Sequence, residues 1–185
     1  MMELYTERLY LRQLEAGDWD LFLALHTDPT VIQYVCDAPS ETETRERFES
    51  RLPHWLPGSR HWLCLVVFDR QSGCAVGVTG LKLEPDEDAT AEVGYLFLSG
   101  QHGKGYGVES LQRVMDYAHD ILGLKVLKAV VTEGNAASCR LLEKCGFVFE
   151  QREGDAYQIN GQFFDDLIYR HRMAGDLSNE AVAIL

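Results

Sequence analysis

The segment from Gln101 to Glu109 constrains this chain more than any other. It reads QHGKGYGVE, with glycines at three alternate positions between an apolar run that ends at Leu98 and a helical pattern that begins near Val108. Glycine lets the backbone adopt conformations and close approaches that a Cβ would forbid. The N–H groups that open a helix converge on one point, where the helix dipole also favours negative charge. With Lys104 in the same loop, the segment predicts a binding site for a phosphate-bearing ligand.

Two well-known phosphate-binding loops do not fit this segment. A Walker A loop needs a glycine at the position of Leu98 and a Ser or Thr at the position of Gly105. The dinucleotide-binding fingerprint would place its third glycine at Val108. A glycine-rich connection that binds nothing is also compatible with the pattern, so the rest of the chain decides.

Length and composition favour one globular domain over residues 1–185. The chain is 46% hydrophobic, which is enough for a sizeable core. It has no apolar run of about 18 residues and no apolar signal-peptide core, so we expect a cytoplasmic protein that does not enter a membrane. Five cysteines without CxxC spacing predict buried, reduced thiols, and six scattered histidines predict no metal site.

The net charge of −12 argues against nucleic acid as a partner, because binding it requires clustered Lys and Arg. It does not exclude an anionic cofactor. Repulsion between distant charges is screened beyond about 8 Å at physiological salt, whereas hydrogen bonds from loop amides act at contact distance. The acidic excess favours a cationic second substrate such as an amine, and it fits ordinary solubility equally well.

Hydrophobic periodicity predicts a mixed α/β chain without repeats or linkers. Helices are expected after Asp18 and after the capping box that starts at Ser40. A further helix starting at Val108 and ending at Gly123 joins strands whose crossover length favours parallel pairing. Asn160-Gly161 predicts a two-residue hairpin turn. The remaining elements are expected at these ranges: strands at 8–12, 61–68, 74–83, up to Leu98, 125–132 and 147–151, and a helix at 136–144.

A second group of polar residues follows the strand predicted at 125–132. If that strand is parallel to its neighbour, its carboxyl end emerges beside the glycine loop, at the edge where such sheets bind ligands. Asn135 is a suitable N-cap for the next helix, and Ser138 lies one turn further on. Plain helix capping and an exposed first-turn serine would also explain these two residues.

Taken in order, these motifs resemble those of the GNAT superfamily of N-acetyltransferases. The loop resembles Q/R-x-x-G-x-G/A, and residues 135–147 resemble N-x-x-S-x-x-L-x-E-K-x-G-F. The opening TERLYLR at Thr6 and the EVGY at Glu92 resemble the ribosomal-protein-alanine acetyltransferase (Rim-type) branch. The resemblance spans about residues 4–173. It implies a GNAT-like α/β (α+β) fold, with a mixed, mostly antiparallel central sheet, a parallel splayed strand pair and flanking helices.

The same resemblance implies acetyl-CoA as cosubstrate and no metal. His102 stands where the family has Gln or Arg, which affects only a side-chain contact. The backbone of Phe97 and Leu98 would follow the pantetheine arm, Asn135 would contact that arm, and Ser138 would lie near the sulfur. The pyrophosphate would be held by the amides of Gly103, Lys104, Gly105, Tyr106, Gly107 and Val108.

Aminolysis of a thioester requires a neutral amine, an oriented carbonyl and a place for negative charge. We expect the Leu98 N–H to polarise the acetyl carbonyl and Glu92 to act as base, although Glu92 could instead pair with a cation. Ser138 is the candidate proton donor to the leaving thiolate, although its high intrinsic pKa favours a role in positioning CoA instead. The tyrosine acid that many family members carry is absent from residues 138–142, and Tyr95 and Tyr106 are alternative donors.

The sequence therefore predicts an acyltransferase that moves an acetyl group from acetyl-CoA to a primary amine, namely a protein N-terminal α-amine, a polyamine or another small amine. The alternative is a non-catalytic acyl-CoA-binding sensor or interaction module with the same fold. The acceptor pocket is expected from residues 21–56 and 155–164. Its candidate aromatic residues, which core packing would explain equally well, are Tyr34, Trp55 and Trp62. A homodimer is possible. The tail from Gly175 could be either disordered or a contact with a partner.

Overall fold

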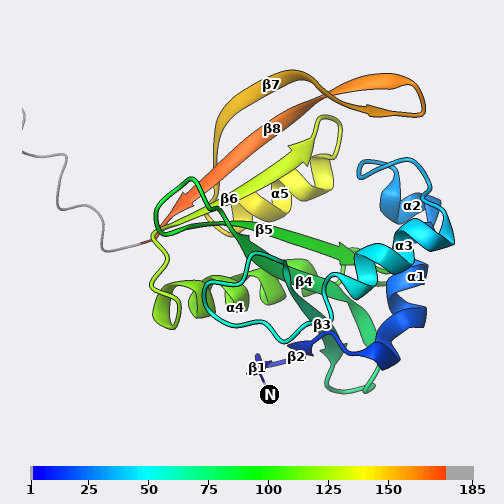
Figure 1. The fold of residues 1–185 in the computed structure, drawn as a ribbon. Helices are drawn as coiled ribbons and strands as arrows, with labels where there is room; N and C mark the ends of the chain where they lie inside the picture. The colour runs from blue at the N-terminus through cyan, green and yellow to red at the C-terminus, as the bar shows by residue number, and fades with distance from the viewer. Residues whose placement is uncertain (1, 174–185) are drawn as a thin grey trace, which may run out of the picture.

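The computed structural model describes residues 2–173 and contains one eight-stranded sheet in the order β1-β2-β3-β4-β5-β6-β8-β7 (Figure 1). Every neighbouring pair of strands is antiparallel except β5 and β6, which are parallel. This confirms the predicted mixed, mostly antiparallel sheet with one parallel pair. The tail from Gly175 lies outside the described residues.

Most elements lie close to the ranges predicted from the sequence, whereas β1, η1, α2 and η2 were not predicted. In chain order they are β1 (Glu3–Tyr5), β2 (Leu9–Gln13), η1 (Ala16–Asp18), α1 (Trp19–Thr27), α2 (Pro29–Ile32), α3 (Glu41–Glu49), β3 (Leu63–Asp69), β4 (Ala75–Leu83), β5 (Thr90–Phe97), η2 (Ser99–Gln101), α4 (Tyr106–Asp120), β6 (Val126–Thr132), α5 (Ala136–Lys144), β7 (Val148–Ile159) and β8 (Gln162–Arg172).

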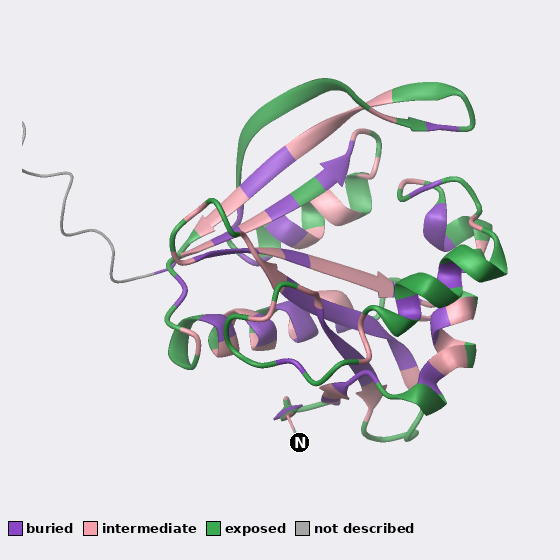
Figure 2. Cartoon of the chain, in the orientation of Figure 1, coloured by how far each residue is buried: buried purple, intermediate pink, exposed green. Residues whose placement is uncertain are grey.

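Two hydrophobic clusters hold helices on opposite faces of the sheet. The larger packs α4 and α5 against one face through residues such as Leu111, Leu127 and Leu142. The smaller packs α1 and α3 against the other face through Phe22 and Phe48. Figure 2 shows that the strands between these helices are largely buried, whereas most of β7 is exposed. Burial of apolar side chains on both faces therefore fixes the middle of the sheet.

Local signals explain where the helices begin. Ser40 and Glu43 form the predicted capping box of α3, since the Ser40 side chain accepts from the Glu43 N–H and Glu43 accepts from the Ser40 N–H at 2.8 Å. Asp18 corrects a prediction: its side chain does not cap α1. Its carboxylate instead accepts hydrogen bonds from the Glu15 N–H and from the Arg12 guanidinium, because the fixed charge is the stronger partner.

The hairpin β7–β8 turns at Asn160 and Gly161, both with positive φ, as the Asn-Gly pair predicts. Strand β7 runs on to Ile159, well beyond the predicted end at 151. The tip of the hairpin reaches the segment after α2, where the Tyr157 hydroxyl donates to the Val35 carbonyl at 2.5 Å and the Asn160 N–H to Asp37 Oδ1 at 2.6 Å. The hairpin therefore forms the edge of the sheet next to β6, and its tip extends towards the segment after α2 (Figure 1).

All five cysteines are free, and three of them, Cys36, Cys64 and Cys145, are buried as predicted. Cys74 is exposed and Cys139 is half-buried, so the prediction of buried thiols is wrong for Cys74 and only partly right for Cys139.

Candidate active site

The glycine loop leads directly into an uncapped helix. Gly103 and Gly105 have φ values of 77° and 82°, in the left-handed region that favours glycine, and Gly105 is the N-cap of α4. No side chain accepts a hydrogen bond at this cap. The first N–H groups of a helix have no partner within the helix. The amides at the start of α4 are therefore available to an anion, at the positive end of a 15-residue helix.

Gly107 has a different role from the other two glycines. It lies inside α4, and a Cβ at this position would come within 2.4 Å of Leu141 Cδ1 on α5. The missing side chain lets α5 pack closely against the first turn of α4. The loop therefore uses two glycines for its conformation and one for a close approach between helices.

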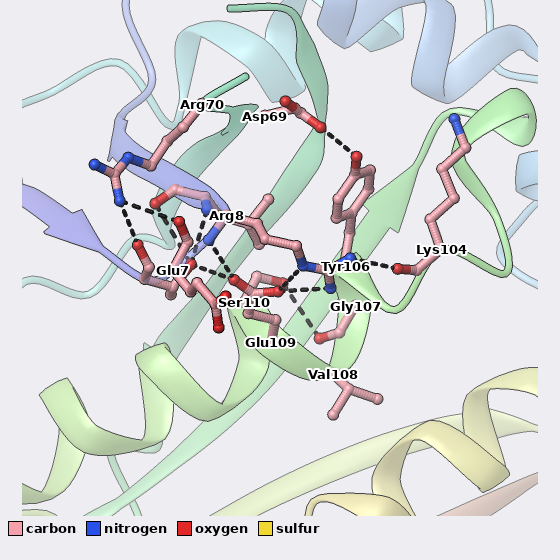
Figure 3. Close-up of polar contacts among 12 residues, drawn as sticks. Glu7, Arg8, Asp69, Arg70, Lys104, Tyr106, Gly107, Val108, Glu109 and Ser110 are labelled. Carbon is pink, nitrogen blue, oxygen red and sulfur yellow. Dashed lines mark hydrogen bonds and ion pairs between the residues drawn. The ribbon is translucent and has the colours of Figure 1, made fainter. Parts of the chain in front are cut away.

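An ion-pair and hydrogen-bond network fastens the loop to the start of β2 (Figure 3). The Arg8 guanidinium donates to Glu109 Oε2 at 2.6 Å and to the Lys104 carbonyl at 3.0 Å. Thr6 Oγ1 donates to the same Glu109 carboxylate at 2.5 Å. Because these bonds join residues about a hundred positions apart, the sequence pattern did not reveal them; the conspicuous TERLYLR segment was the only signal.

A hydrogen bond between Tyr106 and Asp69 also holds the glycine loop in place. The Tyr106 hydroxyl donates to the carboxylate of Asp69, the last residue of β3 (Figure 3). This bond, together with the Ser72 N–H, lowers the pKa of Asp69 from 3.8 to about 2. Tyr106, which the sequence offered as an alternative proton donor, therefore has its hydroxyl engaged in holding the loop.

Beside the loop lies a groove with a volume of about 480 Å³. Two cationic side chains, Arg8 and Lys144, line this groove, and Arg8 is paired with the Glu109 carboxylate. The groove adjoins the amides at the start of α4, because Gly105 and Val108 are part of its lining. The other lining residues are Thr6, Glu7, Glu109 and Gln112.

Strands β5 and β6 diverge next to this loop. Their parallel pairing covers only Thr90–Glu92 and Val126–Lys128, after which β5 continues beside β4 and β6 continues beside β8. Backbone groups of β5 beyond Val93 that face away from β4 therefore have no ladder partner on β6. The predicted splayed pair is confirmed.

The backbone geometry corrects the prediction for Leu98. Its N–H donates to the Val76 carbonyl of the neighbouring strand at 3.0 Å, so it is not available to polarise a carbonyl group of a ligand. In an antiparallel ladder the N–H groups alternate between the two sides. With the observed register, the N–H groups of Tyr95 and Phe97 are the ones that face the opening.

His102 turns back towards β5 instead of towards the loop. Its Nε2 lies 2.9 Å from the Phe97 carbonyl, which faces the opening between the strands. Lys104 Nζ donates to Gln101 Oε1 at 2.8 Å. The side chains of His102 and Lys104 are thus engaged elsewhere. The donors available to a ligand at the start of α4 are the backbone N–H groups.

Asn135 and Ser138 stand where β6 leads into α5, across the opening from β5. Asn135 Oδ1 accepts from the Ser138 N–H at 3.1 Å, which confirms the predicted N-cap. Ser138 Oγ lies 2.6 Å from the hydroxyl of Tyr95 on β5. Burial raises the pKa of Tyr95 well above 10. The two hydroxyls thus bridge the diverging elements and stay protonated at neutral pH.

Glu92 lies on the opposite face of β5 from Tyr95, because residues an odd number apart on a strand face opposite sides. Within residues 2–173 no hydrogen bond or ion pair at contact distance reaches its carboxylate. Burial, followed by the charge of Glu84, raises the pKa of Glu92, while Lys128 and Lys82 oppose the shift. Glu92 is therefore a stronger base than an exposed glutamate.

Of the three aromatic residues predicted to line the acceptor pocket, one belongs to the hydrophobic core and two lie near the opening between β5 and β6. Trp55 is buried, and its Nε1 donates to the His61 carbonyl at 3.1 Å. Trp62 lies against Gly94, within 3.3 Å of where a Cβ would be, on the same face of β5 as Glu92. Tyr34 contacts Gly134, directly before Asn135. Tyr34 and Trp62 thus lie near the opening, whereas Trp55 belongs to the core.

No group of three or more His, Cys, Asp or Glu side chains among the described residues is placed to hold a metal ion. Nor, within residues 2–173, is any helix both long and apolar enough to cross a bilayer.

Comparisons with known proteins identify the chain's relatives. Residues 8–148 match the family described as acetyltransferase (GNAT) domain. An uncharacterised N-acetyltransferase, p20, of Bacillus licheniformis is 29% identical over 89% of this chain and 93% of its own length. A GNAT-family acetyltransferase from Bacillus anthracis has the same fold, with a TM-score of 0.79 at 23% identity over 92% of this chain and 98% of that one. So does the spermidine N-acetyltransferase from Vibrio cholerae, solved with CoA and spermine, with a TM-score of 0.78 at 24% identity over 90% and 96%.

Proposed function

This chain belongs to the acetyltransferase (GNAT) family and uses acetyl-CoA as its acetyl donor; from that premise we propose that it acetylates a primary amine at the opening between β5 and β6. The acceptor is a protein N-terminal α-amine or a small-molecule amine such as a polyamine. The catalytic machinery consists of Glu92, Ser138 and backbone N–H groups of β5.

The observation that carries this proposal is the position of the uncapped start of α4 beside the diverging strands. The free amides from Gly103 to Val108 fit a diphosphate, since each charge-assisted hydrogen bond contributes about 1.5–3 kcal/mol. The groove that Arg8 and Lys144 line together with Glu7 and Glu109 would take the nucleotide end of CoA. The pantetheine arm would then run between β5 and β6, past Phe97, Leu98 and Asn135.

The acetyl group would lie where the N–H groups of Tyr95 and Phe97 face the opening. A carbonyl oxygen that becomes negative during attack is stabilised by donors that are already in place. Tyr95 and Phe97 would therefore polarise the acetyl carbonyl, which is the role predicted for Leu98, because their N–H groups face the opening between β5 and β6.

Glu92 would accept the proton of the attacking amine, directly or through a water molecule. An α-amine has a pKa of about 7.7–8.0 and is partly neutral near physiological pH, whereas a polyamine amine starts closer to the lysine value of about 10.4. The raised pKa of Glu92 brings the base closer to the operating pH, which favours general-base catalysis.

The acceptor would approach on the Glu92 face of β5. Trp62 lies beside Gly94 on that face, and an aromatic ring next to a carboxylate suits a cationic amine. Asp166 on β8 adds a second carboxylate, since its charge acts on Glu92. The name of the Vibrio cholerae enzyme, which was solved with spermine, supports a polyamine as one class of acceptor. The N-terminal motif that resembles the Rim-type branch supports the other.

The experiment is a thiol-release assay with acetyl-CoA and a panel of acceptors: spermidine, spermine, and short peptides with free or blocked N-termini. Acetylation of a polyamine or of a free N-terminus, identified by mass spectrometry, is the expected result. Binding of CoA without thiol release for any amine would instead support the non-catalytic sensor. The variant Gly105→Ala, which strains the loop, serves as a control that should lose activity with every acceptor.

A further inference from the structure

The hydroxyls of Tyr95 and Ser138 share one hydrogen bond, with oxygens 2.6 Å apart. Each hydroxyl carries one proton to donate. Among the described residues neither has another side-chain partner, so one of the two O–H groups is left without a protein acceptor. Ser138 is half-buried at the start of α5, whereas the Tyr95 ring packs against the core. The spare O–H therefore belongs most naturally to Ser138 and points to an acceptor that comes from outside the chain.

Tyr95 and Ser138 lie at the opening between β5 and β6, where the sulfur of acetyl-CoA would react. Tyr95 lies three residues beyond Glu92, the last β5 residue paired with β6, and its side chain faces α5. Ser138 is fixed from its backbone side by Asn135. Because Glu92 lies on the opposite face of β5, a base and a hydroxyl donor flank the opening from its two sides.

We propose that Tyr95 positions Ser138 to donate a hydrogen bond to the thiolate that leaves during acetyl transfer. Tyr95 O–H donates to Ser138 Oγ, which polarises and orients the serine O–H towards the sulfur. This inference rests on the proposed acetyltransferase function and adds a residue that acts through Ser138.

The chemistry balances without a proton being lost from either hydroxyl. The amine nitrogen bonds to the carbonyl carbon, the carbon–sulfur bond breaks, and its electron pair goes to sulfur. The ammonium proton passes to Glu92 or to its water, and solvent water protonates the thiolate. A phenol whose pKa lies above 10 does not give up its proton to a thiolate whose conjugate acid has a pKa of about 8.5. The pair therefore acts as a hydrogen-bond donor to the developing charge, in the manner of an oxyanion hole.

The test compares Tyr95→Phe, Ser138→Ala and the double variant in the thiol-release assay, using the acceptor that the wild-type protein acetylates best. Tyr117→Phe is the matched control: its ring packs on the same core, and within the described residues its hydroxyl makes no hydrogen bond. Tyr95→Phe removes one oxygen and leaves the ring in place, and thermal unfolding verifies that each variant is folded.

We expect Tyr95→Phe and Ser138→Ala each to lower kcat by about 10- to 100-fold, the kinetic equivalent of one hydrogen bond to a charged group. The KM for acetyl-CoA should change by less than about twofold, because the interaction forms only as charge develops. The double variant should be no slower than Ser138→Ala alone. The defect of Tyr95→Phe should be the same from about pH 6 to pH 9, since neither hydroxyl titrates in that range.

Three results would overturn the inference and leave the acetyltransferase function standing: an unchanged kcat for Tyr95→Phe, losses that multiply in the double variant, or an equal loss for Tyr117→Phe. A rise in the KM for acetyl-CoA at constant kcat would likewise assign Tyr95 to CoA binding alone. If the wild-type protein releases no thiol with any amine, the proposed function itself fails, and this inference fails with it.

Discussion

A Cβ atom on Gly107 would lie 2.4 Å from Cδ1 of Leu141, so the first turn of α4 and the face of α5 meet at a contact with no room for a methyl group. This contact joins the two halves of the site. The uncapped amides open α4, whereas Asn135 and Ser138 belong to α5 and its cap. Gly107 therefore allows close packing of α4 and α5 between the predicted diphosphate site and the predicted thioester site.

The first prediction follows from that contact. In a solvent-exposed helix alanine is favoured over glycine by about 1 kcal/mol, but forced overpacking costs about 1–3 kcal/mol. We expect Gly107→Ala to lower the free energy of unfolding by about 1–2 kcal/mol in chemical denaturation. Leu141→Ala should relieve the clash, so the double variant should be more stable than the sum of the single effects. A Gly107→Ala protein more stable than wild type would show that Leu141 moves aside at little cost.

The second prediction concerns the loop conformation. Gly103 has a φ of 77°, and a Cβ there would meet no atom within 4 Å. Alanine at this position is therefore penalised only by backbone strain, of about 1–3 kcal/mol. We expect Gly103→Ala to weaken CoA binding by about tenfold in calorimetry. Gly100→Ala is the matched control, since Gly100 is equally open and does not have a positive φ. Equal affinities for the two variants would contradict a requirement for the left-handed loop.

The third prediction uses the tether between Tyr106 and Asp69. The hydrogen bond from Tyr106 is the largest cause of the lowered pKa of Asp69, which moves from 3.8 to about 2. A depressed carboxyl pKa contributes stability that is present above the unfolded value and is lost as pH falls through the folded value. We therefore expect Tyr106→Phe to lower Tm at pH 7, and the difference from wild type to shrink between about pH 4 and pH 2. A difference in Tm that stays constant across this range would rule out the linkage.

The fourth prediction concerns Glu92. We expect Glu92→Gln to lower kcat by about 100-fold or more with a polyamine, and less with an α-amine, which is already partly neutral. Because the charged form of Glu92 is disfavoured by burial, stability falls as pH rises through its raised pKa. Glu92→Gln should therefore also raise Tm at pH 7. Unchanged turnover from pH 6 to pH 9 would remove Glu92 from the mechanism.

Two neighbours of Glu92 provide controls with opposite signs. Glu84 raises the pKa of Glu92, so Glu84→Gln should move the acid limb of the pH–rate profile to lower pH. Lys128 lowers that pKa, so Lys128→Met should move the limb to higher pH. The maximal rate should change little in either variant, because neither residue is assigned to the reaction. Shifts in the same direction would show that another group controls the limb.

Local signals predicted the elements whose boundaries the sequence itself encodes. Helix α5 spans Ala136–Lys144 as expected, because Asn135 caps it and Gly146, with a φ of 81°, follows its end. The turn at Asn160-Gly161 was predicted for the same reason. Strand β7 was predicted too short, because its polar stretch from Glu150 to Asp155 lacks the alternation of a half-buried strand.

The parts of the site that the sequence did not reveal depend on register and on distant contacts. Whether the N–H of Leu98 faces β4 or the opening is decided by strand pairing, which the residue types do not determine. The bond between Tyr95 and Ser138 spans 43 positions, and the pair formed by Arg8 and Glu109 spans 101. Such contacts follow from the three-dimensional packing of the elements and leave no periodic trace in the chain.

The proposed function requires the amides from Gly103 to Val108 to bind the diphosphate of CoA. Isothermal titration calorimetry of the wild-type protein, with CoA and with pantetheine as separate ligands, measures this directly, because pantetheine lacks the diphosphate and the nucleotide. We expect CoA to bind with a sub-millimolar Kd, pantetheine to bind at least about tenfold more weakly, and Gly103→Ala to reduce only the affinity for CoA. No binding of CoA, or equal affinity for the two ligands, would show that these amides do not bind the diphosphate.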